Sequence, residues 1–505
     1  MKKVLALFVI LTAVFFAACG KKQEQGTGSK EKVVVVSQGA KPKSLDPYMY
    51  NEIPGLAVTR QFYDSLFKKE DDGSITPLLA ESYEYKTPTE LWITLREGVK
   101  FHNGDILSVE DVLFSFQRMQ DTPASAIMIS DIDKVEAVDD RSFKIILKQS
   151  SAPLLFSLSH PLTSILNKKY VEKHQGNIST EPMGTGPYKF VSWGDGEKIE
   201  MIAFDDYFRG RAKVDRVIFR EITEDSSRLA ALETGEIDIA YDMTAIDSGT
   251  IEAKENLTLI SKPTTAVEYI CLNNQKAPFH NKVFRKALDY AIDRQSIIDS
   301  VYLGRAKITN SIVNPNVFGF YDGLKPFSFD PEKAKALIAE SGVKNPRFTL
   351  SINEGSDRQQ AAQIIQANLR EVGIDMKIQI LEWGTYLQST AEGKFEAFLG
   401  GWMSGTSDAD IVLFPLLDTK SFGSAGNRAR YSNPEFDKLV EAARSELDVE
   451  KRKELYKEAQ LILQEDTPMT ILYAKNKNIG LNTRVKGFIY DPTNVHSLYT
   501  LEVEE

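Results

Sequence analysis

Hydrophobic residues in this chain recur with two spacings, one that suits strands and one that suits helices. Val33 to Val36 is a run of β-branched residues typical of a buried strand. Further strands are expected at Leu91–Leu95, Ser142–Leu147, Val217–Arg220, Phe348–Ile352 and Met376–Ile380. Helical patterns alternate with these runs without a fixed repeat period, which excludes solenoids and propellers. The alternation predicts a mixed α/β protein built from several lobes.

Three of the expected helices carry start signals. Ser108 can cap a helix that runs to Arg118 and places Val112, Leu113 and Phe116 on one face. Later in the chain, a capping residue, a first-turn proline and an acid occur together twice, at Asp330–Glu332 and at Asn433–Glu435. Gly342 can end the first of these two helices.

The amino terminus has the pattern of a secretory signal. Lys2 and Lys3 precede an apolar run from Val4 to Ala18, and its 15 residues fall short of the roughly 20 that a membrane-spanning helix needs. Residues 1–18 are therefore predicted to be a cleaved signal peptide, with a retained signal anchor as the alternative. Residues 20–32 lack large apolar side chains and are expected to form a solvated tether.

Composition and charge narrow the class of protein. The chain has 505 residues, 42% hydrophobic and 26% charged, which is the mixture of an ordinary globular protein and excludes a multi-span membrane protein. Its net charge of −10 provides no drive towards nucleic acid or an anionic membrane surface. Two cysteines, Cys19 and Cys271, cannot form a disulfide framework.

The sequence gives little support for a catalytic site. No glycine-rich stretch has the spacing of a phosphate loop, so ATP must be hydrolysed by another protein. The five histidines are too far apart in sequence for the helical zinc pattern, and Ser404 stands one position late for a nucleophile elbow. Cys271 lies in an apolar stretch and is expected to be a buried, unreactive thiol. We therefore expect no enzyme, no cofactor and no metal.

Two segments have the composition of a ligand-binding cleft. Glu382–Leu387 and Gly400–Asp410 combine aromatic side chains, glycines and carboxylates within 30 residues. Trp383 and Trp402 would provide apolar and stacking surface, although Trp402 could equally be a core residue.

Six segments resemble, in order, the family 5 extracellular solute-binding proteins of bacteria. They are Ser44–Pro47, Leu95–Gly104, Asp111–Ser115, Gly184–Tyr188, Gly235–Asp238 and Phe284–Arg294. The likeness covers nearly all of residues 33–505. Individually these segments are typical of turns, capped helices and core faces, and we expect most of them to serve the scaffold. The resemblance rests on the fixed order of the six segments along the chain.

The resemblance implies an α/β, two-lobed periplasmic-binding-protein-like fold of class II, cluster C type, with an extra domain and a hinge cleft between the lobes. Lobe I is expected from residues 33–58, 183–262 and 478–505, the extra domain from 59–182 and lobe II from 263–477. Residues 16–20 resemble in turn the bacterial lipoprotein box, so residues 19–32 are expected to be a lipidated Cys19 and its flexible tether.

The resemblance also assigns roles to residues. In dipeptide-binding relatives the first acid of the segment that corresponds to Gly401–Asp410 pairs with the peptide's amino terminus, a role that comes to Asp408, although Asp408 could instead be a cap or turn residue. Arg358 is suited to the ligand's carboxylate, with Gln359 as the alternative register. The remaining predicted ligand-binding residues are Trp402, Met403, Trp383, Thr406, Asp410 and Tyr48.

The implied function is that of an extracytoplasmic, lipid-anchored receptor of an ABC importer. It would capture short peptides, of two or three residues or glutathione, by hinge closure and deliver them to the permease. We expect a monomer that contacts the membrane through lipid on Cys19 and does not bind nucleic acid. The alternatives are a nickel or haem receptor of the same fold and a non-transport surface lipoprotein. Nickel would favour histidine near the cleft, and none falls in residues 383–410.

Overall fold

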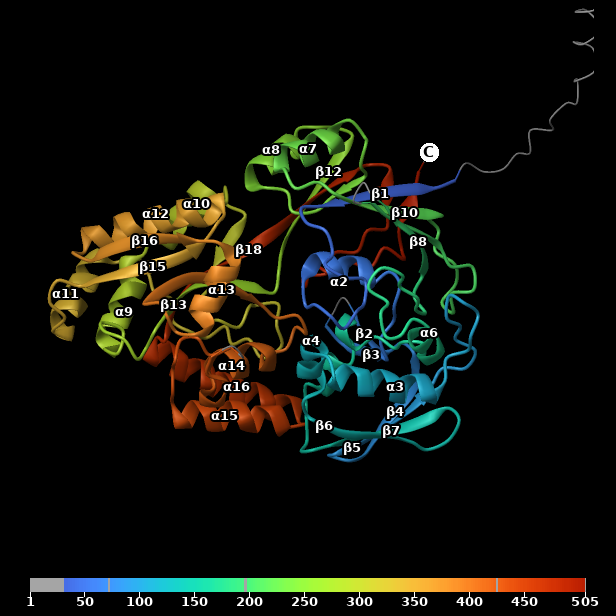
Figure 1. Ribbon diagram of the computed structural model, residues 1–505. Helices are drawn as coiled ribbons and strands as arrows, with labels where there is room; N and C mark the ends of the chain where they lie inside the picture. Colours follow the sequence, from blue (N-terminus) through green and yellow to red (C-terminus); the bar gives the residue numbers. More distant parts are fainter. Residues whose placement is uncertain (1–30, 71–72, 195–197, 424–425, 505) are drawn as a thin grey trace, which may run out of the picture. The chain divides into compact units, whose positions relative to one another are not determined.

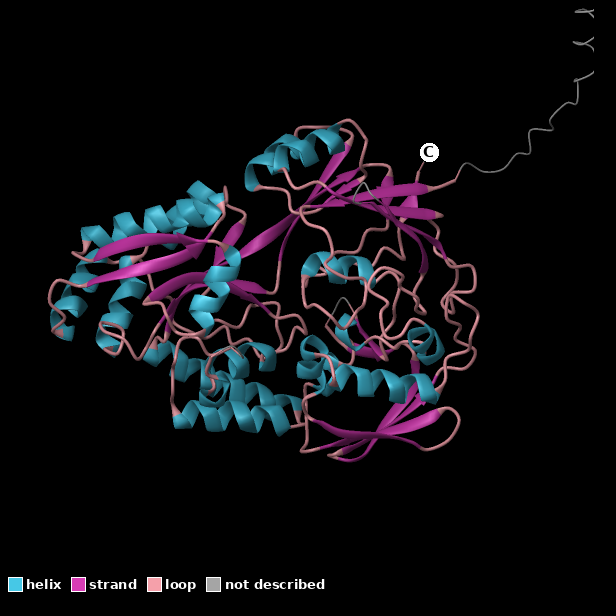
Figure 2. Cartoon of the chain, in the orientation of Figure 1, coloured by secondary structure: helices cyan, strands magenta, loops and turns pink. Residues whose placement is uncertain are grey.

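The computed structural model describes residues 31–70, 73–194, 198–423 and 426–504. The predicted signal peptide, Cys19 and most of the tether lie outside these residues. Residues 33–505 form one compact unit. Figure 1 shows the course of the chain, and Figure 2 shows that helices and strands are interspersed along it. The mixed α/β fold is therefore as predicted.

One large sheet organises most of the described chain. Its strands follow the order β16 (Asp375–Leu381), β15 (Arg347–Asn353), β17 (Ala397–Met403), β13 (Ala266–Leu272), β18 (Met469–Asn482), β11 (Ile239–Ala240), β1 (Val33–Gln38), β10 (Arg216–Glu221), β9 (Lys198–Ala203) and β8 (Tyr188–Gly194). Two more strands, β12 (Leu257–Pro263) and β14 (Ala306–Ile308), also pair with β18. Smaller sheets are β4 (Ala80–Thr87), β5 (Glu90–Leu95), β7 (Ser142–Leu147) and β6 (Ile132–Ala137), then β2 (Phe67–Lys69) with β3 (Ile75–Pro77), and β19 (Val485–Lys486) with β20 (Glu502–Val503).

The helices lie between these strands in sequence. They are α2 (Ile53–Thr59), α3 (Val109–Gln120), α4 (Pro123–Ala126), α5 (Leu154–Ser157), α6 (Lys168–Lys173), α7 (Asp225–Glu233), α8 (Ala245–Glu252), α9 (Lys282–Ala291), α10 (Arg294–Val301), α11 (Pro331–Ser341), α12 (Ser356–Glu371), α13 (Trp383–Ala391), α14 (Asp410–Leu417), α15 (Pro434–Ser445) and α16 (Val449–Asp466). The start signals of α3, α11 and α15 act as predicted, because Ser108, Asp330 and Asn433 each accept a hydrogen bond from a backbone N–H of the first turn.

Strand β18 divides the large sheet into two lobes. Its first residues pair with β13, whereas Asn476 to Asn482 pair with β12. We call the half that contains β1 and β8–β11 the first lobe, and the half that contains β13 and β15–β17 the second lobe. Two stretches of chain continue from one half into the other, β18 itself and the short link between β12 and β13 (Figure 1). The two-lobed fold is thus present, with its lobes joined by few strands as a hinge requires.

The hydrophobic cores follow the same division. One cluster contains the strands of the first lobe and also the small sheet β4–β7 with helix α3. Two other clusters lie in the second lobe, one around β15, β16 and helices α9–α12 and the other around α14–α16. Residues 59–182 therefore share a core with the first lobe, while the second lobe is packed separately. The exact domain boundaries given above stay a prediction.

Two of the segments that resemble the family, Leu95–Gly104 and Gly184–Tyr188, are in direct contact. Gly184 and Gly186 pass so close to Phe62 that a Cβ atom would lie 2.3 Å from its carbonyl oxygen at Gly184, and 2.6 Å from its carbonyl carbon at Gly186. The ring of His102 bridges the same loop, with Nε2 2.9 Å from the Gly186 carbonyl and Nδ1 accepting from the Gly184 N–H at 3.3 Å. These segments form a close backbone crossing and belong to the scaffold.

Replacing Gly186 with alanine is expected to lower the free energy of unfolding by roughly 1–3 kcal/mol, because the added methyl group meets backbone that cannot rotate away. Chemical denaturation measures this change. Gly249 in α8 is a suitable control, since a Cβ there meets nothing within 4 Å and Gly249→Ala should stabilise the helix by about 0.5–1 kcal/mol. Equal stability of Gly186→Ala and wild type would contradict the tight crossing.

His102 should make stability depend on pH. Burial lowers its pKa from 6.5 to about 4, so the folded protein keeps the ring neutral while the unfolded chain takes up a proton. The stabilisation is therefore complete above pH 6.5 and is lost as pH falls towards 4. Between pH 7 and pH 5 we expect His102 to contribute roughly 1–2 kcal/mol to the loss of stability.

The measurement is the free energy of unfolding against pH for wild type, His102→Gln and His280→Gln. His102→Gln should show the shallower decline, whatever its stability at neutral pH. His280 is exposed, and its replacement should leave the slope unchanged. Parallel curves for wild type and His102→Gln would show that the ring titrates normally in the folded protein.

Candidate ligand-binding site

The second lobe has a free strand edge. Strand β17 pairs with β13 along its whole length, but with β15 only at Ala397 and Phe398. Among the described residues, no strand covers the other edge of β17 from Leu399 to Met403. The Leu399 carbonyl accepts a hydrogen bond from the hydroxyl of Tyr386 at 2.9 Å. The backbone from Gly400 to Met403 is therefore placed to accept an added strand.

The two glycines of β17 are required by their neighbours. A Cβ atom at Gly401 would lie 2.6 Å from Oε1 of Glu268, which stands opposite it in the register of β13. A Cβ at Gly400 would lie 3.0 Å from the hydroxyl of Tyr386. The side chains of Glu268 and Tyr386 thus pack directly on the backbone of β17.

Glu268 lies at the centre of a charged cluster. Its carboxylate is buried, 3.4 Å from Nη2 of Arg358 and 3.5 Å from Nζ of Lys475. Lys475 also lies 3.6 Å from Asp357, which accepts a hydrogen bond from Tyr302 at 3.3 Å. Burial alone would raise the pKa of Asp357, yet Lys475 and Arg358 hold this pKa below its usual value. The Asp357 carboxylate therefore stays ionised at neutral pH.

Arg358 is the residue of this cluster that suits a ligand's carboxylate. It lies in the first turn of α12, directly after β15, and its side chain contacts Asn353 and Glu268. Burial lowers the pKa of Arg358, but the nearby charge of Glu268 raises it. The pKa is raised overall, so the side chain keeps its charge. A guanidinium has five N–H groups, so donors remain for a ligand beyond these two contacts. Of the two registers predicted from sequence, the structure places Arg358 in the cluster.

The tryptophans have different surroundings. Trp383 begins α13, is 51% exposed, and stacks on Tyr386 with ring centroids 5.7 Å apart. It remains available to a ligand. Trp402 is half-buried against the α14–α16 core, and its ring N–H donates to the Ile411 carbonyl at 2.9 Å, which is the core role left open above. Met403 ends β17 with its sulfur 3.6 Å from Nδ2 of Asn494.

Asp408 is enclosed in the second lobe. Its side chain is 0% exposed, and Arg452 of α16 binds both carboxylate oxygens, at 2.6 and 2.9 Å. Tyr456 lies 3.4 Å from the same carboxylate. The structure therefore gives Asp408 an internal ion pair and does not bring it together with Arg358. A contact with a ligand's amino group stays a prediction, and it would require Arg452 to be displaced.

Of the other predicted site residues, Asp410 and Tyr48 are also held by protein partners. Asp410 lies 3.1 Å from Nε of Arg444, and burial raises its pKa to about 7. Thr406 is buried in the loop before α14. Tyr48 is buried too, its hydroxyl bonded to the Ser164 carbonyl and its ring 5.2 Å from the guanidinium of Arg118. None of these three contacts the charged cluster in the structure.

Sequence reasoning missed Glu268, Lys475 and Asp357. Glu268 had a usable signal, since it is a lone acid between Val267 and Tyr269 in a strand that is otherwise apolar. Burial of such a residue requires charged partners. Lys475 lies more than a hundred residues further along the chain, and nothing local marks it as one of those partners.

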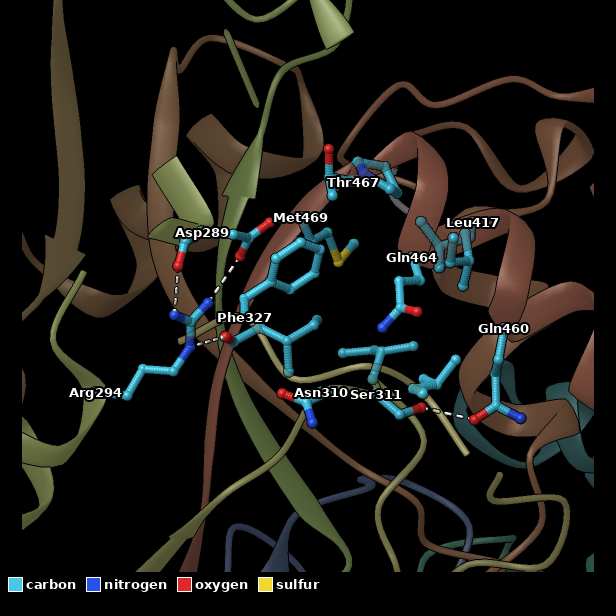
Figure 3. Close-up of a pocket in the computed structure, with 15 residues that line it drawn as sticks. Asp289, Arg294, Asn310, Ser311, Phe327, Leu417, Gln460, Gln464, Thr467 and Met469 are labelled. Carbon is cyan, nitrogen blue, oxygen red and sulfur yellow. Dashed lines mark hydrogen bonds and ion pairs between the residues drawn. The ribbon is translucent and has the colours of Figure 1, made fainter. Parts of the chain in front are cut away.

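Two cavities differ greatly in size. The larger, about 1000 Å³, is lined by residues between 60 and 70, by Gly73 and Leu78, by residues 488–492 and others up to Thr500, and by Asn316, Phe318 and Ser407 of the second lobe. The smaller, about 30 Å³, lies inside the second lobe beside the Asp289–Arg294 ion pair, with Gln460 and Gln464 across from it (Figure 3). Of these two, the larger has room for an organic solute and the smaller does not.

Comparison with known proteins agrees with this arrangement. Residues 74–424 match the family model described as "Bacterial extracellular solute-binding proteins, family 5 Middle". The chain belongs to this family. It is 28% identical to Heme-binding protein A of Haemophilus influenzae over 100% of both chains, and 30% identical to the Glutathione-binding protein GsiB of Salmonella paratyphi A over 90% of this chain and 92% of that protein.

A solved relative has the same fold. The ABC transporter-associated periplasmic binding protein DppA from Helicobacter pylori, in complex with the peptide STSA, superposes with a TM-score of 0.82. It is 30% identical and covers 94% of this chain and 98% of its own. These relatives are named as binding proteins, one of them as ABC transporter-associated, which supports the prediction that this family member is not an enzyme.

The described residues contain neither a cluster of metal-ligating side chains nor a membrane-spanning helix. No three His, Cys, Asp or Glu side chains gather there closely enough to hold a metal ion. In the same part of the chain, every helix is too short or too polar to cross a membrane.

Proposed function

We propose that the protein is the receptor of an ABC importer for short peptides, of two or three residues or glutathione. A peptide would lie along Gly400–Met403 as an added strand, with its carboxylate on Arg358. The observation that carries this proposal is the free edge of β17 beside the Arg358–Glu268 cluster. Main-chain pairing gives affinity with little dependence on side chains, which suits a carrier of varied peptides.

Two further features complete the proposal. The lobes would close on the peptide by bending at the β12–β13 link and β18, and the permease would receive the closed form. Cleavage before Cys19 and lipid on its thiol would hold the protein at the outer side of a membrane as a monomer. The peptide- and glutathione-binding relatives support the ligand class.

Thermal unfolding of the full-length chain tests the ligand class. Dipeptides, tripeptides, glutathione, haem and nickel are added in turn, since a ligand at 100 times its Kd stabilises by about 2.7 kcal/mol. A higher Tm with peptides or glutathione supports the proposal. A higher Tm with haem or nickel alone would replace it with one of those solutes.

Hydrogen exchange tests the binding mode. If a peptide pairs with β17, amide protons among Gly400–Met403 should exchange more slowly in its presence. Binding without added protection there would contradict the added strand, while leaving the ligand class intact.

A further inference from the structure

Three basic side chains of the large cavity have no ion-pair partner. They are Arg60, Arg209 and Lys262, and no carboxylate oxygen in the described chain lies within 4.0 Å of their charged nitrogens. The other two basic residues of the lining are paired, Lys68 with Glu70 at 2.7 Å and Lys69 with Asp491 at 3.5 Å. In a chain with a net charge of −10, three unpaired cations around one cavity call for an explanation.

Arg60 is the most buried of the three. It is half-buried at the end of α2, and its Nε is buried with no acceptor among the described atoms. A buried N–H without an acceptor is costly, and more so on a charged group. Arg209 and Lys262 are exposed and lie over aromatic rings, 5.0 Å from the centre of Tyr499 and 5.9 Å from that of Tyr490. The rings hold these cations at the cavity wall without neutralising them.

The acids of the lining are already bonded. Asp64 accepts hydrogen bonds from Thr185 at 3.0 Å and from Tyr207 at 3.3 Å, so it lies near Arg60 and Arg209 without forming an ion pair. Asp491 accepts from the backbone and hydroxyl of Thr493 in addition to Lys69. The carboxylates of the cavity therefore already have polar partners, whereas none of the three cations forms an ion pair within the described chain.

The cavity is within reach of the free edge of β17. Ser407 lines it, and Ser407 lies only four residues beyond Met403, at most about 14 Å of extended chain. Ser407 is itself held in place by a hydrogen bond from Lys69 at 2.9 Å. A ligand that lies on β17 can thus extend its end or a side chain into the cavity.

We propose that this cavity binds the side-chain carboxylates of the ligand, and that the protein therefore selects acidic peptides. Arg60 would bind one carboxylate at the inner end, with Arg209 and Lys262 attracting a second at the wall. This inference rests on the proposed function and specifies its substrate class.

Isothermal titration calorimetry of the full-length chain tests the inference with two tripeptides of equal size, one carrying two glutamates and the other two glutamines. The acidic peptide should bind roughly tenfold or more tightly, and high salt should reduce the difference. In the double variant Arg209→Gln and Lys262→Gln, affinity for the acidic peptide should fall by roughly tenfold while that for the amide peptide stays unchanged. Both positions are exposed, so this variant should fold.

Lys344→Gln is the matched control, because Lys344 is exposed and does not line the cavity. Arg60→Gln adds the inner position. Equal binding of both peptides, or a double variant that retains the preference, would overturn acid selection and leave peptide binding standing. If neither peptide binds, the proposed function fails, and acid selection fails with it.

Discussion

Replacing Asp408 with alanine is expected to lower the free energy of unfolding by roughly 3–5 kcal/mol. The carboxylate is fully buried and binds Arg452 through both oxygens, and the charge of Asp408 raises the pKa of Arg452 despite the burial of that guanidinium. Removing the acid leaves a charged guanidinium inside the protein, hydrogen-bonded to the Tyr456 hydroxyl and the Ala443 carbonyl but without an ion pair among the described residues. Urea denaturation measures the loss.

Two variants separate this explanation from a general sensitivity to mutation. Asp322→Ala removes an exposed acid of the same lobe and should change stability by less than about 0.5 kcal/mol. Adding Arg452→Met to Asp408→Ala removes the unpaired charge as well, and should recover part of the loss. A stable Asp408→Ala protein that no longer binds peptide would instead restore Asp408 as the anchor of the ligand's amino group.

The contrast between Asp408 and Arg358 shows what the sequence could provide. The resemblance to dipeptide-binding relatives assigns Asp408 to the ligand, as the first acid of the segment Gly401–Asp410. Its partner Arg452 lies 44 residues away on another helix, and no local pattern connects the two. Arg358 comes from the same resemblance, and the structure places it 3.4 Å from Glu268, which packs on Gly401 of β17.

Local signals predicted the elements better than the site. The capping residues Ser108, Asp330 and Asn433 start the expected helices, because a cap acts within one turn of its own position. Strand β17 had no such signal, since its glycines disfavour a strand and are explained only by Glu268 and Tyr386 packing on them. Pairing across distant strands decides where the free edge lies, and sequence pattern alone does not contain that pairing.

Replacing Arg358 with alanine is expected to weaken peptide binding by roughly 2–4 kcal/mol, which is the range for losing a charged partner in a desolvated site. The guanidinium is the donor group beside β17 that matches both oxygens of a carboxylate. Arg358→Lys keeps the charge but not the planar pair of donors, so it should recover only part of the affinity. Calorimetry with a peptide and with its carboxyl-terminal amide measures the effect.

The comparison between the peptide acid and its carboxyl-terminal amide is the more decisive part of this experiment. If Arg358 binds the terminal carboxylate, wild type should prefer the free acid and Arg358→Ala should bind acid and amide alike. Arg347 begins β15 and is exposed, so Arg347→Ala should leave both affinities unchanged. Because Glu268 retains Lys475 at 3.5 Å, the variant leaves no buried acid without a partner, and the protein should stay folded. An unchanged preference for the acid in Arg358→Ala would move the carboxylate to another cation.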